Sequence, residues 1–183
     1  MGVVTTLPRG RPLSRADLEG MPDDGHRYEL VDGSLIVTPA PSLRHQIVVG
    51  ELFVLLRQHC PVGLAVILAP FDVVLDDDTV LQPDLIVARR RDLTAGALPT
   101  APVLAVEVLS PSTRQLDLSL KRARFEAAGC PSYWAVDPDA PSLTVWEDRG
   151  EGYVDVAHAA GTDRCSVDRP YPVVVRPVDL LGR

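Results

Sequence analysis

The sequence predicts an α/β (α+β) fold in a single domain over residues 1–183, with a mixed central sheet flanked by helices. The chain has 183 residues, of which 46% are hydrophobic, and one globular domain usually takes about 100–200 residues. Between its 17 prolines, the windows 42–60 and 112–130 are free of proline and long enough for helices. Short apolar runs separated by turn residues fill most of the remaining sequence, as strands do. Because helical and strand segments alternate along the chain, they favour helix and sheet layers around one core.

Both proline-free windows begin with a serine that can cap a helix, Ser42 in the first and Ser112 in the second. Val48 and Leu52 recur at helical spacing within a wide apolar face in the first window, and the second carries a narrower apolar stripe. The sequence therefore predicts two long helices, together with a short one at 14–21.

The strands are predicted from apolar runs that turn residues bound. Asp32-Gly33-Ser34 signals a hairpin between the first two strands, and Asp76-Asp77-Asp78 signals a second turn. The run 103–109 is almost continuously apolar, which is typical of a strand covered on both faces. The predicted strands are 28–31, 35–38, 64–68, 72–75, 80–88, 103–109, 132–136, 143–147 and 152–156.

Charge and composition narrow the functional classes. The formal net charge is −7, which argues against a protein that coats DNA or a membrane by bulk electrostatics. The 3 cysteines lack CxxC spacing, so neither a disulfide framework nor a zinc site is indicated. Residues 1–12 contain no apolar signal segment, and no run is long enough to span a membrane. We therefore expect a cytoplasmic protein in which residues 1–12 form a flexible or loosely packed arm.

Two acids interrupt the predicted strands. Asp84 follows Pro83 within the run 80–88, and Glu107 is the only polar residue of 103–109. An isolated ionised carboxylate costs several kcal/mol to bury, so each acid needs a cation or an edge position. A Mg²⁺ ion binds one or two carboxylates and keeps several waters. One shared ion would satisfy both acids; the alternative is that each reaches solvent or pairs with an arginine.

Lys121 is the single lysine among the 18 basic residues. It can mark a position where a compact ammonium is needed and a planar guanidinium does not serve. The alternative is a lysine retained by chance on a solvated helix face. There it would pair with Asp117 four residues earlier for about 0.3–0.5 kcal/mol.

Several short motifs occur in a fixed order along the chain: Tyr28-Glu29-Leu30-Val31-Asp32-Gly33, Arg44-His45, Gln82-Pro83-Asp84-Leu85, Val106-Glu107-Val108-Leu109-Ser110-Pro111-Ser112-Thr113, Lys121-Arg122 and Tyr133-Trp134-Ala135-Val136-Asp137-Pro138. Together they resemble the Uma-two family of restriction-endonuclease-like proteins over about residues 13–156. That family belongs to the PD-(D/E)XK nuclease superfamily. The resemblance therefore implies a restriction-endonuclease-like core and hydrolysis of phosphodiester bonds.

The resemblance also implies roles for individual residues. Asp84 matches the motif aspartate and Glu107 the second acid, and the carbonyl of Val108 would be a further ligand of the metal ion. The superfamily's usual lysine lies two residues beyond the second acid, where this chain has Leu109. In this family a lysine of the following helix takes that role, and it matches Lys121.

Three further residues complete the predicted site. Glu29 resembles the additional N-terminal acid of many superfamily members. His45 and Arg114 are candidate contacts to phosphate or water, with a structural role as the alternative for His45. A local basic patch for DNA is predicted from 89–91 and from 112–126, which carries a surplus of positive charge.

The sequence thus predicts a Mg²⁺-dependent or Mn²⁺-dependent endonuclease that hydrolyses DNA and works as a homodimer away from membranes. Such an ion would polarise a phosphoryl oxygen and lower the pKa of its bound water. The competing hypothesis is a non-catalytic nucleic-acid-binding or regulatory module. In that case Lys121 would only neutralise Asp84 and Glu107 in a structural ion pair.

Overall fold

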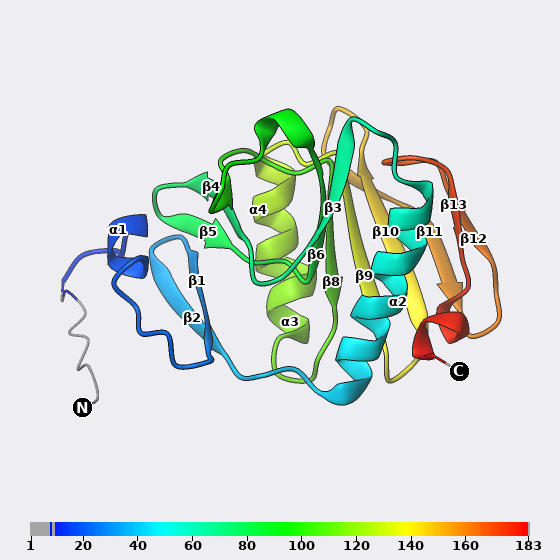
Figure 1. The fold of residues 1–183 in the computed structure, drawn as a ribbon, viewed down its shortest axis with the longest axis horizontal. Coiled ribbons are helices and arrows are strands. Elements are labelled where there is room, and N and C mark those ends of the chain that lie inside the picture. Colours follow the sequence, from blue (N-terminus) through cyan, green and yellow to red (C-terminus); the bar gives the residue numbers. More distant parts are fainter. Residues whose placement is uncertain (1–7, 9, 183) are drawn as a thin grey trace.

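The computed structural model describes residues 8 and 10–182, so most of the predicted N-terminal arm lies outside the described residues. The elements are α1 (Arg15–Leu18), β1 (Arg27–Val31), β2 (Ser34–Thr38), α2 (Leu43–His59), β3 (Leu64–Leu68), β4 (Asp72–Asp76), β5 (Thr79–Leu81), β6 (Leu85–Arg89), η1 (Arg90–Asp92), β7 (Ala97–Leu98), β8 (Leu104–Val108), α3 (Arg114–Leu116), η2 (Asp117–Lys121), α4 (Arg122–Ala127), β9 (Ser132–Asp137), β10 (Ser142–Asp148), β11 (Tyr153–Ala160), β12 (Cys165–Val167), β13 (Val173–Val175) and η3 (Pro177–Leu181). Figure 1 shows how these elements are arranged.

The predicted α/β fold class is confirmed, but the prediction of one mixed sheet is wrong. A 6-stranded sheet has the order β11-β10-β9-β8-β6-β3, and a 5-stranded sheet has the order β2-β1-β5-β4-β7. Each contains one parallel pair, β8 with β9 and β4 with β7. A separate ribbon pairs β12 with β13. The three sheets arise because strand partners are chosen by tertiary packing, which the apolar pattern of a single strand does not encode.

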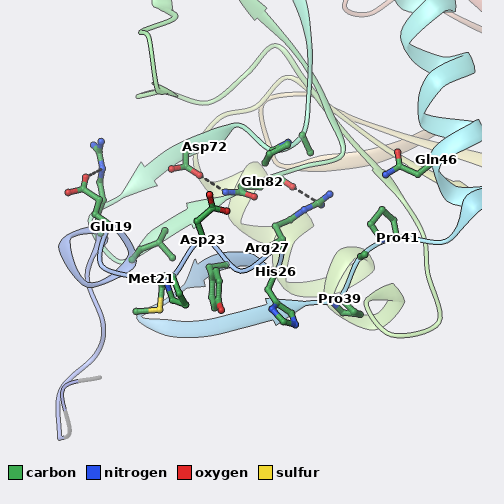
Figure 2. A pocket seen from close by; sticks show the side chains of 18 residues that line it. Glu19, Met21, Asp23, His26, Arg27, Pro39, Pro41, Gln46, Asp72 and Gln82 are labelled. Carbon is green, nitrogen blue, oxygen red and sulfur yellow. Dashed lines mark hydrogen bonds and ion pairs between the residues drawn. The ribbon is translucent and has the colours of Figure 1, made fainter. Parts of the chain in front are cut away.

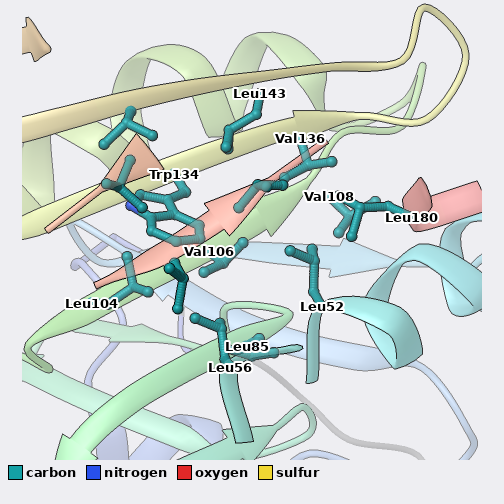
Figure 3. Packing of buried hydrophobic residues seen from close by; sticks show 14 of the residues in the cluster. Leu52, Leu56, Leu85, Leu104, Val106, Val108, Trp134, Val136, Leu143 and Leu180 are labelled. Carbon is teal, nitrogen blue, oxygen red and sulfur yellow. The ribbon is translucent and has the colours of Figure 1, made fainter. Parts of the chain in front are cut away.

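The 6-stranded sheet is covered on both faces, as the apolar run 103–109 predicts. Leu104, Val106 and Val108 of β8 pack with α2 in one core cluster. Ala105 points to the opposite face, where it packs with Phe125 of α4. This alternation follows from the two-residue period of a strand. Figure 3 shows the first cluster, in which leucines of α2 meet apolar side chains of β6, β8 and β9.

The predicted strand 80–88 is wrong as one element. It divides into β5, which lies in the 5-stranded sheet, and β6, which lies in the 6-stranded sheet. Pro83 lies in the connection, and it has no N–H to donate to a strand partner. Asp84 is therefore part of a crossing between two sheets, just before β6 begins.

Two other predictions hold with changes. The hairpin β1–β2 turns at Asp32 and Gly33, whose φ values of 51° and 71° are those of a two-residue turn with both φ positive. The helix predicted from the second window spans α3, η2 and α4, and its middle part, η2, is π-helical. The strands β7, β12 and β13 and the turn η3 were not predicted, since they are short.

No helix among the described residues is long and apolar enough to cross a bilayer.

Candidate active site

A cavity of about 210 Å³ lies between the two large sheets and the helix that contains η2. Six residues singled out in the sequence line it: Glu29, His45, Asp84, Glu107, Val108 and Lys121. They come from β1, α2, the β5–β6 connection, β8 and η2. The fold thus gathers residues from across the chain around one cavity.

The strand register explains how the two central acids meet. Leu85 of β6 pairs with Val106 of β8, and Ile86 pairs with Ala105. Continuing this antiparallel register by one residue sets Asp84 opposite Glu107. The Cβ atoms of directly opposite residues lie about 4.5–5.5 Å apart, so both carboxylates can reach the same ligand.

Lys121 is buried among acids, and the hypothesis that it lies on a solvated helix face is wrong. Its side chain is only 2% exposed. Nζ lies 2.9 Å from Oε1 of Glu29, 3.2 Å from Oε1 of Glu107 and 3.6 Å from Oδ1 of Asp117. Burial lowers the pKa of Lys121, but these three carboxylates outweigh burial and raise it above the usual value. Lys121 is therefore a buried, charged ammonium.

The π-helical segment η2 presents this lysine to the cavity. Both of its buried residues, Asp117 and Lys121, belong to the cluster. The hydroxyl of Tyr133, from β9 beneath the helix, donates a 2.8 Å hydrogen bond to the carbonyl of Asp117. π-helical turns are rare and are found frequently at functional sites.

Asp84 is held by three donors. The backbone N–H of Val108 donates to Oδ2 at 2.9 Å, and Nε2 of His45 lies 3.0 Å from the same oxygen. Nη1 of Arg27 donates to Oδ1 at 3.0 Å. Burial raises the pKa of Asp84, but His45, Arg27 and the Val108 N–H together outweigh burial, so the pKa lies below its usual value. Asp84 is thus an ionised, fixed carboxylate.

Glu107 lies in a different environment. Burial raises its pKa well above the usual value; Lys121 opposes this, while the nearby charges of Asp117, Asp84 and Glu29 reinforce it. Among the described residues, this cluster holds four buried carboxylates beside Lys121 and Arg27, and His45 contacts one of the four, Asp84. Burial therefore opposes the simultaneous ionisation of all four carboxylates.

The residues present fit a divalent cation. Among the described residues, no group of three or more His, Cys, Asp and Glu side chains is arranged to hold a metal ion. Mg²⁺ does not require such a group, because it binds through one or two carboxylates and retains waters. Asp84 and Glu107 offer the oxygen ligands that Mg²⁺ prefers, and a divalent cation beside Glu107 would favour the ionised form of this acid.

Sequence reasoning missed two members of the cluster, Arg27 and Asp117, as site residues. Arg27 precedes Glu29 by two positions on β1, so the period of a strand puts both on the same face. That spacing could have identified it. The spacing to Lys121 predicts Asp117 as a surface partner, whereas this residue is buried.

The arginines predicted to form a basic patch are not gathered at the cavity. Arg122 lies over the Trp146 ring, 4.7 Å from its centre, and Arg124 pairs with Asp32. Residues 89–91 begin at Arg89, the last residue of β6, which lies five positions after Asp84 and so roughly 17 Å along the strand at about 3.3 Å per residue. Lys121 itself is buried, so it cannot belong to a surface patch.

Arg114 lies outside the cavity lining and pairs with Asp137. Its side chain is 52% exposed. We expect Arg114→Ala to lower the free energy of unfolding by about 1 kcal/mol, because the half-exposed guanidinium is screened by solvent and the buried Asp137 keeps the backbone N–H groups of Asp139 and Ala140 as donors. Cleavage assays should show nearly unchanged activity. A loss of cleavage activity of about tenfold or more would show that Arg114 contributes to the active site.

A buried acid and lysine cluster, set beside a mixed sheet with helices on both faces, defines a protein of the restriction-endonuclease-like class. The particular family follows from comparison with known sequences. A family model described as "Uma2: Putative restriction endonuclease" matches residues 15–179, and the chain belongs to this family. The family predicted from the sequence motifs is confirmed.

A solved structure supports the fold. The chain is similar to the crystal structure of a putative nuclease belonging to DUF820 from Anabaena variabilis ATCC 29413, with a TM-score of 0.72 and 18% sequence identity. The similarity covers 93% of this chain and 98% of that chain. No curated protein matches.

Proposed function

We propose that this protein is a Mg²⁺-dependent or Mn²⁺-dependent endonuclease that hydrolyses phosphodiester bonds of DNA. One observation carries the proposal: three buried carboxylates surround the buried Lys121, and a fourth, Asp84, lines the same cavity. Burying a charged cluster is costly, so its presence in an apolar core favours a functional role. Family membership points to nuclease chemistry.

Asp84, Glu107 and the carbonyl of Val108 would hold the ion, which supplies Lewis-acid polarisation of a phosphoryl oxygen and a bound water of lowered pKa. Lys121 stabilises the negative charge that develops on the phosphate, a role that suits a buried ammonium. Glu29 and Asp117 fix the position of that ammonium.

His45 orients Asp84 through Nε2. Its other ring nitrogen, Nδ1, is buried and has no hydrogen-bond partner in the part of the chain that the structure describes. We assign this nitrogen to contact with water or phosphate in the loaded site.

The test is cleavage of plasmid and short labelled DNA in Mg²⁺, Mn²⁺ or EDTA. Wild type should cleave only with the metal ion, and Asp84→Asn should not cleave. Asp155→Asn is the matched control, because it removes an exposed carboxylate on β11. Equal cleavage by wild type and Asp84→Asn would overturn the assignment of the site.

A second candidate is a non-catalytic nucleic-acid-binding or regulatory module. It is favoured by the donors on Asp84, since both carboxylate oxygens already have partners without a metal ion. Wild-type protein that binds DNA but cleaves no substrate under any metal condition would select this candidate.

The assembly and location belong to the same proposal. We propose one domain, acting as a homodimer in the cytoplasm with DNA as the substrate. Light scattering at tens of micromolar tests the dimer, and a monomer alone would contradict it.

A further inference from the structure

A second and larger cavity adjoins the candidate active site. Its volume is about 510 Å³, and it shares Arg27, Pro39, Ala40 and Pro41 with the lining of the first cavity. Arg27 stands between the two, because its Nη1 donates both to Asp84 and to the carbonyl of Gln82. Figure 2 shows this cavity between the α1–β1 segment, the β2–α2 connection and the Gln82 region.

The sizes of the two cavities indicate that they bind different parts of the substrate. Ligand pockets usually measure about 300–1,000 Å³. The first cavity, at about 210 Å³, can hold an ion and a phosphate but is too small for a nucleoside. The second has room for one, next to the place where the phosphate would lie.

The charge of the second cavity excludes a phosphate as its main ligand. Its lining has two cations, Arg15 and Arg27, against three acids, Glu19, Asp23 and Asp72. Arg15 is paired with Glu19 at 3.2 Å, and Arg27 is paired with Asp84. A phosphate would therefore meet surplus negative charge, whereas an uncharged base would not.

Acceptor oxygens in the cavity lining favour a ligand that carries hydrogen-bond donors. Nε2 of Gln82 donates to Asp72 at 2.7 Å, while Oε1 of Gln82 is buried without a partner among the described residues. Amino and ring N–H groups of nucleobases donate to such amide and carboxylate oxygens. Tyr28 and Met21 add an aromatic and an apolar surface on which a base can stack.

We infer that the second cavity binds one unpaired nucleobase of the substrate, next to the phosphodiester bond that is cleaved. This inference rests on the proposed nuclease function. A base in a duplex is stacked and paired, so it must be extruded or already unpaired to enter a pocket. The substrate class is therefore single-stranded or locally unpaired DNA.

The first test measures binding of labelled 12-nucleotide DNA in EDTA by fluorescence anisotropy. The probes are one mixed-sequence single strand, the same sequence as a duplex, and an abasic strand of equal length. The single strand should bind roughly tenfold or more tightly than either other probe, because base stacking contributes strongly and the abasic strand keeps the charge. Equal binding of the single strand and the abasic strand, or no binding of the single strand, would overturn the inference.

The second test uses the sign of a charge effect. Asp72→Asn should weaken binding of the single strand several-fold, because an acceptor for base N–H groups is lost. If the cavity does not touch DNA, removing a negative charge should leave binding unchanged or strengthen it, as in the control Asp155→Asn. Unchanged or stronger binding by Asp72→Asn would overturn the inference.

Gln82→Met provides a variant without a charge change. It removes the unpartnered Oε1 acceptor and also the Nε2 hydrogen bond to Asp72, so the variant should fold with a modestly lower melting temperature while single-strand binding falls several-fold. Retained binding in a folded Gln82→Met protein would overturn the inference.

The two proposals fail differently. Base-dependent binding without metal-dependent cleavage would contradict the nuclease and support the base cavity. Metal-dependent cleavage with equal rates on duplex and single strand would support the nuclease and contradict the base cavity.

Discussion

Lys121→Met is expected to abolish metal-dependent cleavage and to lower the free energy of unfolding at pH 7 by about 3–5 kcal/mol, the usual cost of removing one partner from a buried ion pair. Nζ of Lys121 is the shared cation of Glu29, Glu107 and Asp117. Without it, three buried carboxylates lose their nearest positive charge. Cleavage assays and urea unfolding measure the two effects.

The pH dependence of this variant has a defined sign. The pKa values of Glu107 and Asp117 lie above their usual values in the folded protein, with burial as the largest cause. Groups with raised pKa favour folding at low pH, and that stability is lost as pH rises through the raised pKa. Removing Lys121 raises both values further. The stability deficit of Lys121→Met should therefore shrink between pH 7 and pH 5, and a constant deficit would contradict this account.

Lys121→Arg tests whether positive charge alone is sufficient for cleavage. A guanidinium restores positive charge but is planar and larger than an ammonium. The variant should be more stable than Lys121→Met and still cleave poorly. Full cleavage by Lys121→Arg would remove the specific role assigned to the lysine.

Glu107→Gln should abolish cleavage and raise the free energy of unfolding at pH 7 by about 1 kcal/mol. Glu107 is a buried acid whose raised pKa shows that its charged form is disfavoured. Neutralising such a group commonly stabilises a protein, and active sites keep such groups at a cost in stability. Lys121 would retain Glu29 and Asp117 as partners. Calorimetric melting and cleavage assays measure the opposite changes.

Glu147→Gln is the matched control for this prediction. Glu147 is also buried, but it pairs with Arg149 at 2.7 Å and with Arg169 at 3.8 Å and lies outside the candidate active site. The control should lose stability and keep cleavage. A stability loss in both variants, with cleavage kept in both, would show that Glu107 has a structural role alone.

The sequence predicts much of the fold because its signals are local. Proline-free windows with a serine at the start give α2 and the α3–η2–α4 helix, and alternating apolar residues give most strands. The division of 80–88 between two sheets is not local, since it depends on which strands each half meets. Pro83 was the one local sign of the break.

For the candidate site, too, local sequence signals identify some residues, and the others depend on tertiary packing. Asp84 and Glu107 are visible in the sequence because a carboxylate in an apolar run needs an explanation. The spacing of Asp117 and Lys121 fits an exposed helix pair and a buried one equally well, and only the packing of η2 on β9 distinguishes them. Arg27 reaches Asp84 through the tertiary fold, across 57 residues of sequence.

Isothermal titration of the metal-free protein with Mn²⁺ tests the central claim most directly, namely that Asp84 and Glu107 form a divalent metal site. The account predicts one bound ion per chain for wild type and for Asp155→Asn, and loss of that binding in Asp84→Asn. Identical binding by wild type and Asp84→Asn, or no binding by wild type, would contradict it.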